Sequence, residues 1–315
     1  MPLAAANLEC RLLDACIACY AISNGTLNPS APGYADVGFT PGTTPTVFVD
    51  GVEGINAGFV GETADGWVIV AYRGTLPPFS GSFWPWVEDW LHDFELGPMD
   101  WNVGGKVIGR VETGFGTAVL NTWAAVQAAL NAMDLKSKKG ILVTGHSKGG
   151  GMTFPACTLL KNLYPAMLVE NCSYAAPLTC DQTFAAAYYA MGLKAFTVRY
   201  QNQVDIVPFL PYYPHFAMLA SAERLFTGGV NNSITAEKWP DIENDYVPIG
   251  ALRYLGDGCQ VEYGDQGETD ATNALWHALD HFDFDAIVDA HAAAGRYHTC
   301  ICGAAQSTLA IEAQT

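Results

Sequence analysis

The segment formed by residues 140–163 constrains the fold more than any other part of the chain. Residues 140–144 form a short apolar run typical of a buried strand, and residues 148–163 have the pattern of a helix. Between them lies Gly145-His146-Ser147-Lys148-Gly149, which matches Gly-x-Ser-x-Gly. This pattern is typical of a sharp strand-to-helix turn that strains the serine backbone and exposes its oxygen at the carboxyl end of a sheet. We therefore predict that Ser147 is a nucleophile; the alternative is a glycine-rich turn with a helix-capping serine.

Strand-like and helix-like segments alternate along the rest of the chain, which predicts the fold class. Apart from residues 140–163, strands are expected at residues 46–49, 67–72, 171–175 and 195–200. Helices are expected at residues 8–22, 116–133 and 182–191. Such alternation predicts an α/β fold with a mostly parallel central sheet and helices on both faces. Because no repeat, low-complexity tract or charged linker divides the chain, we expect residues 1–315 to form a single domain.

The charge balance excludes several classes of partner. Lys and Arg contribute 15 residues and Asp and Glu 32, so the formal net charge is −17. Nucleic acid and anionic lipid surfaces both attract basic proteins, so neither is an expected partner, and a neutral or zwitterionic substrate fits better. No uninterrupted apolar run is long enough to predict a transmembrane segment, which needs about 18 residues or more. The N-terminus lacks the pattern of a signal peptide, which predicts a cytoplasmic protein unless an export signal was removed or is unconventional.

The nine cysteines are an odd number, so at least one of them is unpaired. Cys16-x-x-Cys19 could be a redox pair or half a zinc site, but it lies in a helical run and no second cluster follows at zinc spacing. We interpret these residues as buried thiols in a reduced compartment. Cys300-x-Cys302 has the same interpretation, with the alternative that one of its cysteines pairs with another.

Five blocks of sequence, taken together and in order, resemble the class 3 lipase family of α/β-hydrolases. The resemblance is to a bacterial-type member of this fungal-lipase-like family, and it covers roughly residues 68–210 with a weaker C-terminal part. The blocks are residues 71–75, 89–93, 111–115, 144–150 and 202–208. The resemblance implies an α/β-hydrolase fold with a lid-like loop.

A serine nucleophile needs a base and an orienting carboxylate, which α/β-hydrolases supply in the order Ser, Asp or Glu, His. Asp205 in Asp205-Ile206-Val207-Pro208 matches the family's triad acid position by position. The alternative for Asp205 is a carboxylate that caps the turn before Pro208.

Chain order alone does not select the histidine base, because five histidines follow Asp205: His215, His277, His281, His291 and His298. The family places its histidine in a loop before a short final helix, and His291 fits this best, with His281 as the alternative. His277 and His281 are four residues apart, which could suit a metal, but no Glu follows His277 as the HExxH pattern requires. Surface or packing roles are expected for that pair.

The oxyanion that forms during acyl transfer needs N–H donors. The helix N-terminus after Ser147 makes the Lys148 N–H one candidate, and the resemblance makes Thr75, in Arg73-Gly74-Thr75, the other. The alternative for Arg73-Gly74-Thr75 is simply the turn that ends a strand.

An aromatic-rich segment, about residues 76–92, matches the position of the family's lid. It suggests Trp84, Trp86 and Trp90, together with His146, as substrate-binding residues. A fixed loop packed into the core is the alternative.

The function predicted from the sequence is hydrolysis of lipid or other acyl esters by a Ser-Asp-His triad through an acyl-enzyme, as in a triacylglycerol lipase or carboxylesterase. A phospholipase A1-type enzyme, a short-chain esterase and an inactive lipid-binding module are the alternatives. No metal or organic cofactor is implied. The expected partner is a small-molecule or lipid ester, with transient contact at a lipid interface, and the sequence makes no prediction of oligomeric state. Residues 227–267 are expected to add a strand pair, to which no role is assigned.

Overall fold

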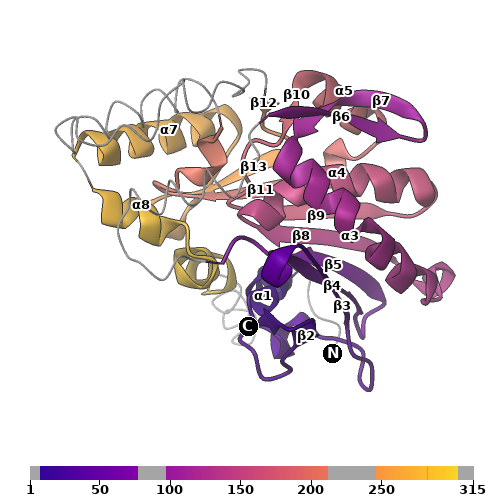
Figure 1. The fold of residues 1–315 in the computed structure, drawn as a ribbon. Helices are drawn as coiled ribbons and strands as arrows, with labels where there is room; N and C mark the ends of the chain where they lie inside the picture. Colours follow the sequence, from indigo (N-terminus) through magenta and orange to yellow (C-terminus); the bar gives the residue numbers. More distant parts are fainter. Residues whose placement is uncertain (1–7, 77–96, 212–245, 282, 304–315) are drawn as a thin grey trace, which may run out of the picture.

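The central feature of the computed structural model, which describes residues 8–76, 97–211, 246–281 and 283–303, is an eight-stranded sheet (Figure 1). Its strands lie in the order β14 (Val261–Tyr263), β13 (Ala251–Leu255), β11 (Thr197–Asn202), β9 (Val169–Tyr174), β8 (Gly140–His146), β5 (Trp67–Tyr72), β4 (Asn56–Glu62) and β3 (Thr46–Asp50). The run from β13 to β5 is parallel, while β14, β4 and β3 pair antiparallel at the edges. The predicted mostly parallel sheet is therefore confirmed.

Helices cover both faces of this sheet. On one face α1 (Leu8–Cys19) contacts β5 and β8, while α3 (Thr113–Asn131) and α4 (Lys148–Leu163) pack on the other (Figure 1). The other helical segments in the described ranges include α5 (Gln182–Ala190), α7 (Gly264–Asp280), α8 (Phe284–Ala290) and a C-terminal helix at residues 298–303. This arrangement is the α/β-hydrolase fold that the sequence predicted. No helix in the described ranges is long and apolar enough to cross a membrane.

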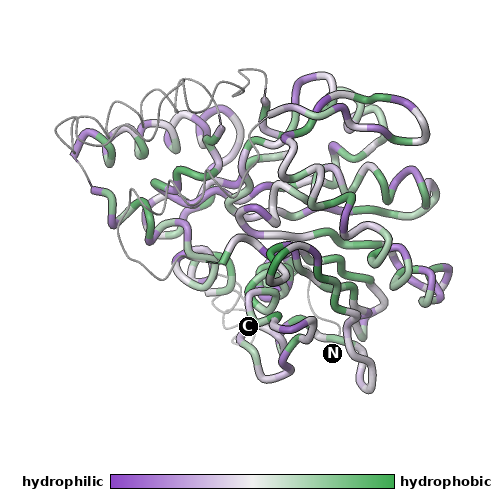
Figure 2. Tube along the Cα trace, viewed as in Figure 1, coloured by the Kyte–Doolittle hydropathy of each residue, from purple (hydrophilic) through white to green (hydrophobic). Residues whose placement is uncertain are grey.

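The apolar runs in the central strands follow from burial on both faces. In β5, Val68 and Val70 point into the core shared with α3 and α4, while Ile69 and Ala71 point into the core beneath α1. Side chains alternate between the two faces of a strand, so a strand covered on both sides is apolar throughout. Figure 2 shows this concentration of hydrophobic residues along the central strands.

A smaller second sheet was not predicted from the sequence. It has the order β12 (Tyr246–Val247), β10 (Cys180–Asp181), β7 (Lys106–Glu112) and β6 (Pro98–Val103), and a two-stranded hairpin pairs β1 (Ile22–Ser23) with β2 (Thr26–Leu27). The strand pair expected within residues 227–267 is present as β13 and β14.

The structure confirms the prediction for one pair of cysteines and corrects the prediction for another. Cys16 and Cys19 are buried thiols between α1 and the sheet, as predicted. Cys300 and Cys302 are not thiols, because Cys259 pairs with Cys300 and Cys10 pairs with Cys302. The interpretation of Cys300 and Cys302 as thiols was wrong because the C-terminal part of the described chain folds back against α1. The spacing of cysteines along the sequence does not reveal that proximity.

The packing of α1 generates a stability prediction. Leu13 is fully buried in the core beneath α1, so Leu13→Ala should lower the free energy of unfolding by about 2–5 kcal/mol. Leu120→Ala is the matched control, because Leu120 is 46% exposed and should change stability by less than about 0.5 kcal/mol. Urea titration of the three proteins measures both values; equal losses would contradict the placement of α1.

Candidate active site

The turn between β8 and α4 holds Ser147 in a backbone conformation that few residues adopt. Its φ is 59° and its ψ is −129°, and its N–H donates a 2.9 Å hydrogen bond to the Tyr174 carbonyl oxygen. A Cβ at Gly145 would lie 2.1 Å from the Gly149 carbonyl oxygen, and a Cβ at Gly149 would lie 2.2 Å from that of Tyr72. Both glycines are therefore required by close backbone approach, and the strained serine sits at the carboxyl end of β8.

His291 is hydrogen-bonded to both Ser147 and Asp205. The Nε2 atom of His291 is 2.9 Å from Ser147 Oγ, and its Nδ1 atom is 3.0 Å from Asp205 Oδ1 and 3.1 Å from Oδ2. Asp205 follows β11, whereas His291 follows α8, so three distant segments meet at this point. Of the histidines suggested by the sequence, His291 is the one that the described structure brings to the serine.

Asp205 is fully buried, and its carboxylate has donors besides His291. The Val207 N–H donates to Oδ1 at 3.0 Å, and the Tyr297 hydroxyl donates to Oδ2 at 2.8 Å. The Tyr297 oxygen in turn accepts the Asn202 N–H at 3.0 Å. These bonds compensate the loss of water around a buried carboxylate and fix its orientation. The sequence carried no signal that Tyr297 belongs to this network.

His146 has both ring nitrogens engaged within the protein. Its Nε2 lies 2.7 Å from the His291 carbonyl oxygen, which can only accept, so this nitrogen carries the proton. Its Nδ1 then accepts the Tyr20 hydroxyl at 2.8 Å. Burial lowers the pKa of His146 well below its usual value, with the charge of His291 adding to the effect, so the ring stays neutral. The ring thus holds the backbone of His291; its predicted role in substrate binding stays a prediction.

The segment Arg73-Gly74-Thr75 lies directly beside the serine. A Cβ at Gly74 would be 3.1 Å from Ser147 Cβ and 2.7 Å from the His146 carbonyl oxygen. The Arg73 guanidinium anchors the segment by donating to the carbonyl oxygens of Ile22 and Gly54. The Thr75 hydroxyl is buried and has no hydrogen-bond partner among the residues that the structure describes.

The other predicted residues are either placed elsewhere or not described. His277 and His281 stack on one another at the end of α7, with ring centroids 4.1 Å apart, and His281 Nδ1 contacts the His277 carbonyl oxygen. Lys148 begins α4 immediately after the serine. Trp84, Trp86, Trp90 and His215 lie outside the described residues, as does most of the lid-like segment.

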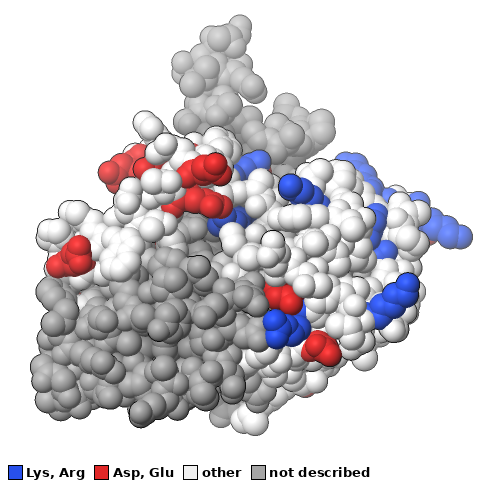
Figure 3. All heavy atoms as spheres, turned by 90° about the horizontal axis from the view of Figure 1, so that it is seen from above, with Lys and Arg blue, Asp and Glu red and all other residues white. Residues whose placement is uncertain are grey.

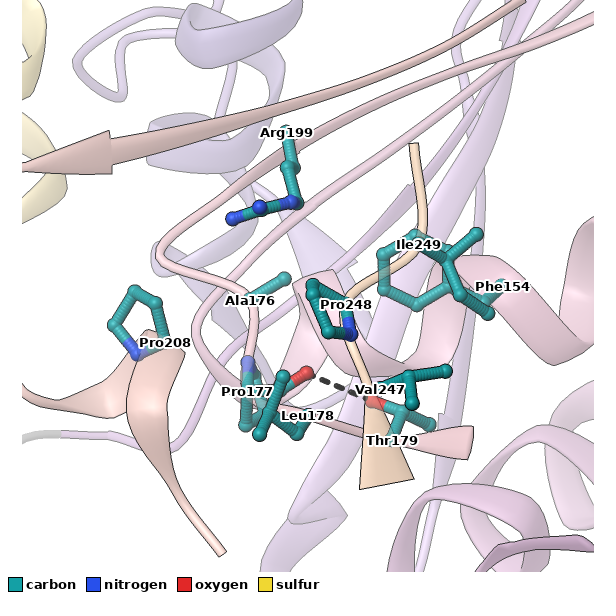
Figure 4. A pocket seen from close by; sticks show the side chains of 10 residues that line it. All are labelled: Phe154, Ala176, Pro177, Leu178, Thr179, Arg199, Pro208, Val247, Pro248 and Ile249. Carbon is teal, nitrogen blue, oxygen red and sulfur yellow. Dashed lines mark hydrogen bonds between the residues drawn. The ribbon is translucent and has the colours of Figure 1, made fainter. Parts of the chain in front are cut away.

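A small pocket lies beside α4, the helix that follows Ser147 (Figure 4). Its enclosed volume is about 10 Å³, which is room for about one water molecule. Its lining is mostly apolar and consists of Phe154, Ala176, Pro177, Leu178, Thr179, Arg199, Pro208, Val247, Pro248 and Ile249. Ala176 packs close to Gly150 in the first turn of α4, and Pro208 follows Asp205 by three residues, so the pocket adjoins the site.

Charged side chains are sparse over much of the described face seen in Figure 3. Acidic groups gather toward the upper left of this view and basic groups toward the right, and a small mixed cluster of both signs lies near the lower middle. Such a surface suits an uncharged ligand better than a polyanion.

Part of the sequence and the fold are similar to those of known lipases. Residues 69–214, which include Thr75, Ser147 and Asp205, match the family of class 3 lipases. A mono- and diacylglycerol lipase from Aspergillus oryzae superposes with a TM-score of 0.63 at 20% identity, covering 92% of this chain and 96% of that one. A triacylglycerol lipase from Penicillium expansum gives 0.57 at 17% identity, with 86% and 90% covered. A further triacylglycerol lipase gives 0.58 at 14%, with 83% and 86% covered.

The match over residues 69–214 identifies the chain as a serine ester hydrolase, and the solved structures show that it shares their fold. No curated protein matches the chain.

The buried neutral His146 generates a prediction about pH. Its folded pKa lies below the unfolded value of 6.5, so the unfolded chain takes up a proton that the folded chain does not, and stability falls as the pH drops below 6.5. His146→Gln should remove about 1.4 kcal/mol per pH unit from that slope. Urea unfolding between pH 5 and pH 7 measures it, with His277→Gln as the exposed control; identical slopes in all three proteins would contradict a neutral His146.

Proposed function

We propose that the chain hydrolyses lipid acyl esters with Ser147 as nucleophile, His291 as general base and acid, and Asp205 as the orienting carboxylate. The observation that carries this proposal is the continuous line of hydrogen bonds from Ser147 Oγ through both nitrogens of His291 to Asp205. A serine hydroxyl is a poor nucleophile at neutral pH, and this arrangement supplies the base that it needs.

The reaction follows from the direction of these bonds. Asp205 accepts the Nδ1–H of His291, which leaves Nε2 unprotonated and facing Ser147 Oγ. His291 removes the serine proton as Oγ attacks the ester carbonyl, and then gives that proton to the leaving alcohol. Water, deprotonated by the same imidazole, releases the acid from the acyl-enzyme. The buried Asp205 stabilises the imidazolium that forms in both steps.

In this proposal, Thr75 and Lys148 stabilise the oxyanion. Helix geometry directs the N–H groups of the first turn of α4 toward its N-terminus, where Ser147 lies. On the other side, Gly74 brings the backbone of Thr75 beside Ser147. The buried Thr75 hydroxyl without a protein partner is suited to donate to a negative oxygen that is present only during the reaction.

The proposed substrate is an uncharged acylglycerol. The mostly apolar residues that line the small pocket next to the site and the acidic net charge of −17 support an uncharged acyl ester over an anionic one. The Aspergillus oryzae enzyme is a mono- and diacylglycerol lipase and superposes over nearly its whole length. In the third similar lipase, a serine protease triad forms the catalytic centre, which supports the same arrangement here.

The choice of histidine is tested by two substitutions. His291→Ala should lower kcat for p-nitrophenyl butyrate by about 10⁴-fold, because the base is lost while the binding site remains. His281→Ala should leave kcat within about twofold, since His281 contacts its own helix instead of Ser147. If His281→Ala were the inactive protein, the proposed triad would be wrong.

The Thr75 hydroxyl is tested separately from its N–H. Thr75→Val keeps the shape and the N–H but removes the hydroxyl, and should lower kcat by about 100-fold with little change in KM. Thr75→Ser restores a hydroxyl and should recover most of that loss. Equal rates for the two variants would show that the hydroxyl does not stabilise the oxyanion.

Substrate class is tested by comparing esters. We expect a faster rate on emulsified tributyrin and monoacylglycerol above their solubility limits than on the soluble fraction. An unchanged rate across that limit would favour the short-chain esterase, and preferential cleavage of phosphatidylcholine would favour the phospholipase A1-type enzyme.

A further inference from the structure

Four side chains with metal-binding atoms converge where the two ends of the described chain meet. Cys10 and Asp14 lie one turn apart on α1, and His298 and Cys302 lie one turn apart on the helical residues 298–303. Their sulfur, oxygen and nitrogen ligand atoms all lie within 4.8 Å of one another. This cluster is separate from the candidate active site, and the proposed function does not use it.

The contacts within the cluster bring together all four donors. His298 Nε2 is 3.1 Å from Asp14 Oδ1, and Asp14 Oδ2 is 3.5 Å from Cys10 Sγ. The two sulfurs are joined as the Cys10–Cys302 disulfide. Asp14 and Cys302 are buried, while the His298 side chain is 41% exposed, so the cluster is open to solvent on its histidine side.

We propose that Cys10, Asp14, His298 and Cys302 bind one zinc ion once the Cys10–Cys302 disulfide is reduced. Two thiolates, an imidazole and a carboxylate form a donor set that suits tetrahedral zinc. Bonds of about 2.0–2.3 Å to zinc place neighbouring ligand atoms about 3.3–3.8 Å apart. The separations of 3.1 Å between His298 Nε2 and Asp14 Oδ1 and of 3.5 Å between Cys10 Sγ and Asp14 Oδ2 are already close to those values. The two sulfurs must move apart once the bond between them is cleaved.

Reduction and zinc binding replace the disulfide crosslink with a metal crosslink. A phosphine reductant cleaves the S–S bond and takes oxygen from water to become a phosphine oxide, which leaves two thiols. The zinc ion then displaces the two thiol protons to solvent, while the Asp14 carboxylate and the neutral His298 imidazole bind through lone pairs. The disulfide and the zinc site are therefore alternative links between α1 and the C-terminal helix. The zinc form would keep the two joined in a reducing compartment.

Cobalt uptake tests the proposal without any measurement of enzyme activity. Reduced full-length protein, treated with a phosphine and titrated with Co²⁺, should gain thiolate-to-cobalt charge-transfer and tetrahedral d–d absorption at one ion per chain. Zn²⁺ should then displace the Co²⁺ completely. Oxidised protein should take up neither ion.

Matched variants assign the ligands. Asp14→Asn and His298→Ala retain the disulfide for folding and purification, and after reduction each should weaken Zn²⁺ binding by more than about tenfold. His277→Ala, which removes an exposed histidine elsewhere, should leave binding unchanged. Cys259→Ser with Cys300→Ser removes the other disulfide and should keep the cobalt spectrum.

Two results would overturn the proposal. One is the absence of Co²⁺ and Zn²⁺ binding by reduced wild-type protein. The other is unchanged binding in both Asp14→Asn and His298→Ala, which would place the metal on other thiols.

Discussion

The close approach of backbone atoms around Gly145 and Gly149 is the constraint on which the rest of the site depends. Because neither position has space for a Cβ, the chain can pass from β8 into α4 within one sharp turn. That turn gives Ser147 its positive φ and directs its oxygen out of the carboxyl end of the sheet. The first turn of α4 then lies next to that oxygen. The same turn therefore positions both the proposed nucleophile, Ser147, and one proposed oxyanion donor, the Lys148 N–H.

The remaining groups reach the serine because parallel strands end at the same edge of the sheet. Thr75 follows β5 and Asp205 follows β11, on opposite sides of β8 in the strand order. His291 belongs to no strand, so its position depends on contacts made by its segment. Tyr297, six residues later, donates to Asp205, and His146 holds the His291 carbonyl oxygen. The histidine is therefore fixed through its backbone as well as through its ring.

The sequence predicted the parts of the structure that are encoded locally. The range of α4 was predicted to the residue, and β5 and β8 were recognised, because each combines a clear period with a glycine or polar boundary. In the second sheet, β10 and β12 have two residues each, too few to show a pattern, whereas β6 and β7 have six and seven residues and were not recognised. Ser147 and Asp205 were found from their motifs. His291 was preferred over His281 by resemblance alone, and no local signal marks Tyr20 as a partner of His146 or Tyr297 as a partner of Asp205. Likewise, the spacing of the cysteines pointed to Cys16 and Cys19 as a possible redox or metal site. The four-donor cluster could not be predicted from spacing, because it joins residues that are far apart in the sequence.

The central claim is that Ser147 becomes acylated during ester hydrolysis. The most direct measurement is peptide mapping by mass spectrometry after inactivation with a fluorophosphonate, a reagent that traps activated serines. If Ser147 is the nucleophile, we expect one adduct per chain, located on Ser147, with loss of ester hydrolysis in proportion to labelling and no adduct in His291→Ala. Stoichiometric inactivation with the adduct on a different serine would contradict that claim.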